Sequence, residues 1–297
     1  MVELQKIATE QRNPNTMDID TLSTLDMVKR INQEDHRVAD AVALVTEPIA
    51  KAIDVIAAHL SGGGRLIYCG AGTSGRLGIL DAVECPPTYS TDPETVQALM
   101  AGGYGAIFKA VEGAEDSKEL GVTDMKGIHF CGKDVLVGIA ASGRTPYVLG
   151  CMEYAKSLGA PTIAVTCCPG SILDTFADIG IAPAPGPEVV TGSTRMKSGT
   201  AQKMVLNMLS TGAMIKLGKV YGNLMVDVKP SNEKLVRRCV TIVCSATDCP
   251  EETAVQALEQ CGYHPKTAIV MVLCGVDAET ANQMLEKAGG RIAKVLK

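Results

Sequence analysis

Short apolar runs alternate with longer segments of helical periodicity through the middle of this chain. The runs have the length and composition of strands that are buried in a parallel sheet. We expect strands at 66–69, 95–100, 134–139, 162–166 and 179–181. Between them, apolar residues recur at helical spacing, most clearly over 147–158 and 198–217. Because helices alternate with strands and no hairpin turn intervenes, the pattern predicts an α/β fold, a parallel sheet with right-handed crossovers.

The chain on either side of this region has a different pattern. Apolar residues over 24–59 fall at helical intervals, and we expect Pro48 to divide them into two helices. After a helix expected over 231–245, three short helical segments are separated by single glycines. These segments lie at 251–261, 265–274 and 277–288. The predicted domains are an N-terminal arm and helix at 1–50, an α/β domain at 51–230 and a C-terminal helical region at 231–297.

A loop of small residues follows the first expected strand and leads into a helix. It runs from Gly70 to Gly75, and its glycines allow the backbone to come close to a ligand. Thr73 and Ser74 stand where an N-cap hydroxyl belongs, beside the amide groups that open a helix and attract phosphate. A tight turn without any ligand would use the same residue types, so this loop alone leaves both interpretations open.

A second loop of the same kind favours a ligand. Between Ala141 and Pro146 it contains Ser142, Gly143 and Thr145. In a parallel sheet both loops leave the carboxyl ends of strands, where open α/β folds bind ligands. Neither loop carries the lysine of a nucleotide-binding P-loop or the full dinucleotide fingerprint. A phosphorylated sugar therefore fits better than a nucleotide.

A third group of hydroxyls lies around the start of the long helix expected over 198–217. They belong to Ser193, Thr194, Ser198 and Thr200, and the cations Arg195 and Lys197 are adjacent. A well-capped core helix with solvated charges would have the same sequence. Because two other hydroxyl loops occur in the chain, we favour a third contribution to one anion-binding pocket.

Composition and charge exclude several classes of protein. The 297 residues carry a formal net charge of -5 without a block of like charges, which argues against nucleic acid and anionic membranes as partners. No apolar run approaches the roughly 20 residues of a membrane span, and the polar N-terminus is unlike a signal peptide, so we expect a cytoplasmic protein. The 11 cysteines form no CxxC pair and the 4 histidines are far apart, so we expect no metal site.

Several motifs together resemble a known family. The two loops, at 69–78 and 140–145, are similar to those of the sugar isomerase domain superfamily. Further segments narrow the resemblance to the N-acetylmuramic acid 6-phosphate etherase family of bacterial peptidoglycan recycling. These segments lie at 9–13, 81–87, 111–116 and 192–203, and the resemblance covers nearly the whole chain.

The resemblance implies a fold, a reaction and a set of site residues. The fold is a three-layer sandwich, the sugar isomerase domain, followed by a small three-helix bundle like that of ubiquitin-associated domains. The reaction removes D-lactate from C3 of N-acetylmuramic acid 6-phosphate by elimination and hydration, giving N-acetylglucosamine 6-phosphate, with no metal or organic cofactor. Glu84 is expected to be the acid at lactate and Glu115 the base at C2. The expected substrate-binding residues are Thr73, Ser74, Ser142, Gly143, Thr145, Ser193 and Thr194.

Two other functions would use the same phosphate loops. A non-catalytic sugar-phosphate sensor, like the related glucokinase regulatory proteins, would bind the sugar and a partner protein. An aldose–ketose isomerase would remove the C2 proton but expel no lactate. Glu84, followed by Cys85 and two prolines, and the chain length of 297 residues favour the etherase over both.

The length of a helix predicts a homodimer. A helix that runs unbroken from Ser74 to Glu84 would separate these residues by about 15 Å. A hexose phosphate is shorter than that between its phosphorus and C3. Either the helix ends early and the chain doubles back, or Ser74 of one subunit and Glu84 of the other serve the same sugar. We favour the shared site.

Overall fold

The computed structural model describes residues 8–228, 230 and 232–297, which form two compact units. The first unit contains the chain up to Ala82 together with Glu94–Ser210, and the second contains Val83–Pro93 and Thr211–Lys297. Within the described ranges, no helix is both long and apolar enough to cross a membrane.

The first unit is built on a five-stranded parallel sheet with the order β2-β1-β3-β4-β5. Its strands are β1 (Leu66–Gly70), β2 (Val96–Met100), β3 (Val135–Ile139), β4 (Thr162–Val165) and β5 (Ile179–Ile181). Every expected strand is present. The chain runs from β1 outward to β2 and then returns to β3 on the other side of β1, so the strand order reverses between β1 and β3. This reversal is where doubly wound sheets place their ligands.

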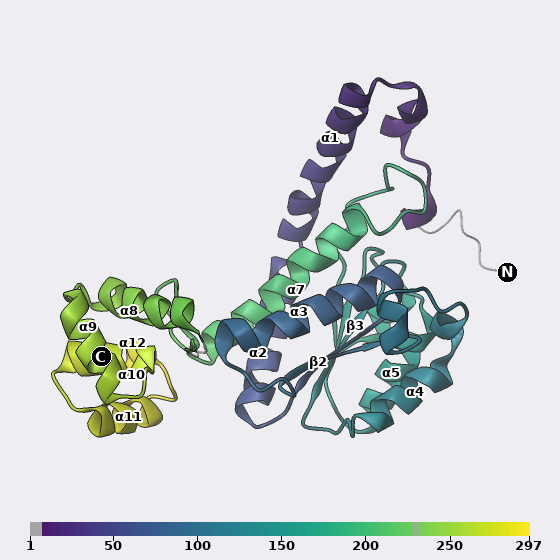
Figure 1. Cartoon of the computed structure of the whole chain (residues 1–297). Coiled ribbons are helices and arrows are strands. Elements are labelled where there is room, and N and C mark those ends of the chain that lie inside the picture. Colours follow the sequence, from purple (N-terminus) through teal and green to yellow (C-terminus); the bar gives the residue numbers. More distant parts are fainter. Residues whose placement is uncertain (1–7, 229, 231) are drawn as a thin grey trace. The chain divides into compact units, whose positions relative to one another are not determined.

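Helices cover both faces of this sheet (Figure 1), with α2 and α3 on one face and α4 and α5 on the other. Alternate strand residues face the two layers. Ile67 and Leu136 share a core cluster with Val148 of α5. On the opposite face, a Cβ on Gly78 of α3 would lie 3.0 Å from Cβ of Tyr68, so the glycine lets α3 pack closely on β1. The three-layer α/β sandwich predicted from the sequence is confirmed.

The helices that begin in this unit are α1 (Thr24–Ala43), α2 (Thr46–Ser61), α3 (Gly72–Tyr89), α4 (Lys118–Gly127), α5 (Pro146–Ser157), α6 (Ile172–Phe176) and α7 (Lys197–Lys216). Two boundaries differ from expectation. The break between α1 and α2 precedes Pro48, which lies in the first turn of α2, where its missing N–H has no helical partner. α3 already begins at Gly72, so Thr73 and Ser74 lie in its first turn and not at the N-cap.

The N-terminal segment is fixed onto the chain that precedes α7. The Asn13 amide donates to the carbonyl oxygen of Pro187 at 3.1 Å, and the Thr16 hydroxyl donates to that of Val189 at 2.9 Å. Thr9 is buried as well. The polar residues that lack periodicity in the sequence are therefore ordered by tertiary hydrogen bonds.

The second unit is a helical bundle with a small antiparallel hairpin. Its core includes Val226, Cys239, Leu258, Ile269 and Leu285. The three helices expected at its end are present, and the expected first residue of the helix before them, Ser231, lies outside the described residues. The elements are β6 (Val220–Tyr221), β7 (Leu224–Met225), α8 (Glu233–Thr247), α9 (Glu251–Gln260), α10 (Pro265–Cys274), α11 (Ala278–Lys287) and α12 (Ile292–Val295).

Candidate active site

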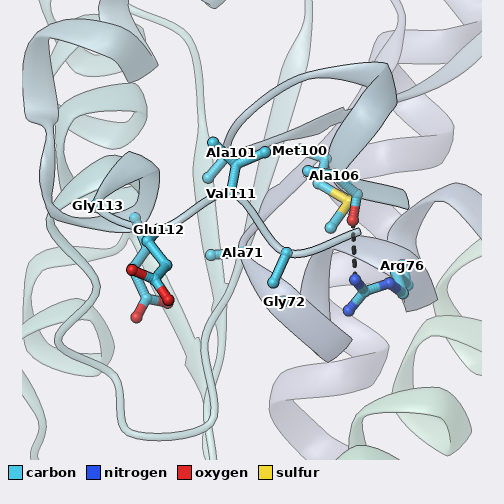
Figure 2. Close-up of a pocket in the computed structure, with 11 residues that line it drawn as sticks. Ala71, Gly72, Arg76, Met100, Ala101, Ala106, Val111, Glu112 and Gly113 are labelled. Atoms are coloured by element: carbon cyan, nitrogen blue, oxygen red, sulfur yellow. Dashed lines mark hydrogen bonds between the residues drawn. The ribbon is translucent and has the colours of Figure 1, made fainter. Parts of the chain in front are cut away.

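A pocket of about 200 Å³ lies where β1 and β2 end (Figure 2). The first loop contributes Ala71 and Gly72, and the segment after β2 contributes most of the remaining wall. Figure 2 shows Glu112 and Arg76 on either side of Gly72. The full lining is Ala71, Gly72, Arg76, Met100, Ala101, Ala106, Ala110, Val111, Glu112, Gly113 and Glu115. The fold thus brings residues of the first loop together with Glu115 in one pocket.

Glu115 is carried by a short 3₁₀ helix, η6 (Ala114–Asp116). Ala114 is buried in the same core cluster as Ile67 of β1 and Tyr147 of α5. Glu115 itself is exposed. The buried alanine therefore anchors the turn, while the neighbouring carboxylate stays at the pocket surface.

Arg76 ties the first turn of α3 to the segment after β2. Its Nε donates to the carbonyl oxygen of Ile107 at 2.8 Å, and its Nη2 donates to that of Ala106 at 2.8 Å. Arg76 and Glu112 are pocket residues that the sequence analysis did not single out. The signal for Arg76 was available, because it directly follows Gly75 at the end of the first loop.

The second loop leaves the sheet beside the first, because Gly70 pairs with Ile139 in the parallel ladder. Gly143 has a φ of 65°, and a Cβ there would lie 2.0 Å from Ser171 Oγ, so the turn requires glycine. The buried Ser171 Oγ has no hydrogen-bond partner among the described residues. Thr145 is the residue directly before α5, whose first residue is Pro146. Ser142, Gly143 and Thr145 thus lie together at the neighbouring strand end, outside the lining of the pocket.

The first loop also contacts the start of α7. A Cβ on Gly199 would lie 3.4 Å from Cγ2 of Thr73. The buried Ser74 donates its hydroxyl hydrogen to Oε1 of Gln202 at 2.9 Å. The Gln202 Nε2 is buried without a partner among the described residues. The first loop and the start of α7, two of the three hydroxyl-rich segments, are therefore adjacent, and the buried side-chain amide of Gln202 lies at their contact.

Ser193 and Thr194 form the turn that precedes α7, and both are half-buried. The carbonyl oxygen of Thr194 accepts from the Gly199 amide at 2.9 Å. The backbone amides of Lys197 and Ser198 each donate to the carboxylate of Glu188 at 2.9 Å. Because a carboxylate already occupies this helix start, these two amides are not free for a ligand.

A buried ion pair connects α7 to α1. Lys197 Nζ lies 2.7 Å from Oε2 of Glu34, and both side chains are almost completely buried. Asn13 and Asn15 also donate to the Glu34 carboxylate, at 2.7 and 2.9 Å. Burial raises the pKa of Glu34, but the hydrogen bonds from Lys197 and the asparagines outweigh it and lower the pKa to about 2. Glu34 thus joins the N-terminal segment to the start of α7.

Glu84 lies further along α3 and is exposed. Earlier in the same helix, the buried Asp81 accepts from the Tyr68 hydroxyl at 2.8 Å and from the Ser210 hydroxyl at 3.1 Å. Burial raises the pKa of Asp81. α3 continues through Pro86 and on to Tyr89, so it does not end before Glu84.

Known proteins have a similar fold, and some have a similar sequence over nearly the whole chain. The glucokinase regulatory protein N-terminal SIS domain matches residues 48–156, and the SIS domain matches residues 131–212. The chain is 59% identical to N-acetylmuramic acid 6-phosphate etherase of Photorhabdus laumondii over 98% of this chain and 97% of the relative. It is 58% identical to N-acetylmuramic acid 6-phosphate etherase 1 of Vibrio cholerae over 99% of this chain and 98% of the relative.

A solved structure shares the fold at lower identity. Phosphoheptose isomerase from Neisseria gonorrhoeae has a TM-score of 0.51 and 18% identity, covering 64% of this chain and 98% of that one. This likeness concerns the fold alone.

Proposed function

The chain belongs to the N-acetylmuramic acid 6-phosphate etherase family, and from this premise we propose that it cleaves the D-lactyl ether of N-acetylmuramic acid 6-phosphate. The products are N-acetylglucosamine 6-phosphate and D-lactate. The observation that carries the proposal is 59% identity over nearly full length to a protein named for this activity. The pocket that joins the first loop to Glu115 supports it.

The chemistry follows from the substrate. An ether oxygen is a poor leaving group, but opening of the sugar ring exposes an aldehyde at C1 that acidifies the hydrogen on C2. A base removes this proton, the electron pair forms the C2–C3 double bond, and the C3–O bond breaks as lactate leaves. An acid gives lactate its proton, and water then adds to C3 while C2 regains a proton. The substrate's own aldehyde stores the negative charge.

Two carboxyl groups are proposed for these proton transfers. Glu115 is the base at C2, supported by its place in the pocket beside the first loop. Glu84 is the acid at the lactate oxygen, supported by its motif of Glu84, Cys85 and two prolines. General acid and base catalysis of this kind contributes roughly 10² to 10⁴ in rate for each group.

The 6-phosphate is proposed to bind at the hydroxyl-rich loops. Ser142 and Thr145 can donate from the end of β3, and Ser74 from the first turn of α3. Ser74 now donates to Gln202, whose Nε2 lacks a partner among the described residues. A half-turn of the Gln202 amide would let Nε2 donate to the serine oxygen, and the serine proton would then be free for phosphate. Thr73, Gly143, Ser193 and Thr194 complete the proposed set of substrate-binding residues.

We further propose that the working unit is a homodimer with shared sites. α3 is unbroken from Gly72 to Tyr89, which removes the alternative that the chain doubles back before Glu84. Along the helix, Ser74 and Glu84 are about 15 Å apart, more than the span from phosphorus to C3. Exposed apolar residues offer a surface for a second subunit, since Leu80 on α3 and Met208 on α7 are 41% and 36% exposed.

Incubation with N-acetylmuramic acid 6-phosphate, followed by an assay for free D-lactate, tests the proposed activity. The etherase releases lactate and N-acetylglucosamine 6-phosphate. A sugar-phosphate sensor would bind without turnover, and an isomerase would change the sugar while the lactyl group stays attached. Either of these two results would refute the proposal. The Glu84→Ala protein, prepared in parallel, controls for a contaminating enzyme.

A further inference from the structure

The pocket is lined by more acidic than basic side chains, although the proposed substrate is itself an anion. Of the described residues that line it, Glu112 and Glu115 are acidic, and Arg76 alone is basic. The substrate brings two anionic groups, the 6-phosphate and the lactyl carboxylate. Without a cation, a pocket with two carboxylates would repel a third.

The guanidinium of Arg76 is already oriented. Carbonyl oxygens of Ala106 and Ile107 hold Nη2 and Nε, each at 2.8 Å. The Nη1 group makes no hydrogen bond to the described residues, and one hydrogen of Nη2 is also left over. A guanidinium that is fixed on one side presents its other donors at low entropic cost, and this fork matches a carboxylate.

We propose that Arg76 binds the lactyl carboxylate and thereby selects substrates that carry it. The inference rests on the proposed function, in which Glu115 removes the proton from C2. The lactyl ether is attached to C3, the adjacent carbon, so a cation in the same pocket as Glu115 lies close to the lactyl group. The phosphate is at C6, at the far end of the open chain, and its proposed donors Ser74, Ser142 and Thr145 are not part of the pocket lining. Ala101, Ala106 and Val111 also line the pocket and give it apolar surface of the kind that suits the lactyl methyl group.

A purely structural role for Arg76 makes a different prediction. If Arg76 only anchors the segment that contains Ala106 and Ile107, its loss should slow every substrate by a similar factor. If it binds the carboxylate, its loss should act on the charged substrate and spare a neutral analogue. The ratio of the two rates separates these roles.

The experiment compares N-acetylmuramic acid 6-phosphate with its lactyl carboxamide, an uncharged analogue. The measurement is kcat/KM for release of lactate or lactamide. The wild-type protein should prefer the carboxylate by roughly 10- to 100-fold, the range expected for hydrogen bonds between charged groups. Arg76→Gln should bring the ratio close to one, and Arg76→Lys should retain part of the preference. Lys109→Gln is the matched control, because it removes an exposed positive charge from the same segment outside the pocket lining.

Binding of N-acetylglucosamine 6-phosphate shows whether each variant is folded, because this product lacks the lactyl group and should bind Arg76→Gln as it binds the wild type. Equal losses on both substrates, or a wild-type protein that does not discriminate between them, would overturn the role of Arg76. The comparison of the two substrates with the wild-type protein needs no variant, so it tests the proposal even if Arg76→Gln does not fold. A wild-type protein that releases neither lactate nor lactamide would instead refute the proposed function.

Discussion

Ser74 and Glu84 lie on the same unbroken helix, α3, with Ser74 in its first turn. Since about 15 Å of helix separates them, a shared site predicts complementation between two inactive variants. One variant carries Ser74→Ala with Ser142→Ala, and the other carries Glu84→Ala. After subunit exchange, mixed dimers should contain one intact site, and part of the lactate-releasing activity should return.

The control for this experiment is each variant mixed with itself under the same exchange conditions. Exchange is verified by labelling the two variants with different fluorophores. A mixture that exchanges subunits but recovers no activity would reject the shared site, as would a monomer that is fully active at assay dilution.

Removal of the Ser142 hydroxyl should weaken binding of the sugar phosphate. A lost hydrogen bond to a charged group costs about 1.5–3 kcal/mol, and the turn itself depends on Gly143, so Ser142→Ala should fold normally. The measurement is calorimetric titration with N-acetylglucosamine 6-phosphate. Ser157→Ala is the matched control, because the exposed Ser157 lies at the other end of α5 and, among the described residues, donates to the carbonyl oxygen of Tyr154 alone. Unchanged affinity in Ser142→Ala would remove this serine from the phosphate site.

The buried pair of Glu34 and Lys197 predicts a pH-dependent stability. The pKa of Glu34 is lowered from 4.5 to about 2, so its ionised form stabilises the native state above pH 4.5. This contribution is lost as the pH falls from 4.5 towards 2, because the unfolded state then binds a proton that the native state does not. Glu34→Gln should reduce the free energy of unfolding by about 3 kcal/mol at neutral pH.

Urea denaturation of wild type and Glu34→Gln at pH 7 and at pH 3 measures this effect. The difference between the two proteins should shrink at the lower pH. Asp35→Asn, at the exposed neighbouring position on α1, should change the stability little at either pH. A difference that is the same at both pH values would mean that the charge of Glu34 does not stabilise the fold.

The central strands β1, β3 and β4 were predictable from the sequence because each is a short apolar run in which every residue is buried. The edge strands β2 and β5 are only partly buried. The loop that contains Gly143 was predictable because glycine and proline determine its backbone conformation locally. Lys197 was expected beside the hydroxyls of an anion-binding pocket, yet it is buried in an ion pair with Glu34. Its local sequence could not predict this pair, because Glu34 is distant in sequence. The available signal was the position of Glu34. It lies four residues before the buried Val38 and therefore on the same, buried face of the helix.

The pocket could be predicted only in part. Of the expected site residues, Glu115 lines the pocket, beside Gly72 of the first loop, whereas the expected hydroxyl residues are not part of its lining. The position of Arg76 next to the first loop was visible in the sequence, but its hydrogen bonds were not predictable, because they go to backbone carbonyl oxygens. The turn that carries Glu115 is a 3₁₀ helix of three residues, too short to produce a periodic signal.

The two carboxylates should be separable by hydrogen exchange at C2. With the substrate in deuterium oxide, Glu84→Ala should still exchange the C2 hydrogen through Glu115 but release no lactate. Glu115→Ala should lose both the exchange and the release. Proton magnetic resonance of the recovered substrate measures the exchange. Loss of exchange in Glu84→Ala together with its retention in Glu115→Ala would show that the acid and base roles are reversed.

The central claim is that lactate leaves by elimination across C2 and C3 and that water then adds to the sugar. The most direct test is to run the reaction in deuterium oxide enriched in heavy oxygen and to locate the isotopes in both products. We predict deuterium at C2 and heavy oxygen at C3 of N-acetylglucosamine 6-phosphate, with the original ether oxygen retained in D-lactate. Heavy oxygen in the lactate hydroxyl, or a sugar product that keeps its original C2 hydrogen, would contradict the account.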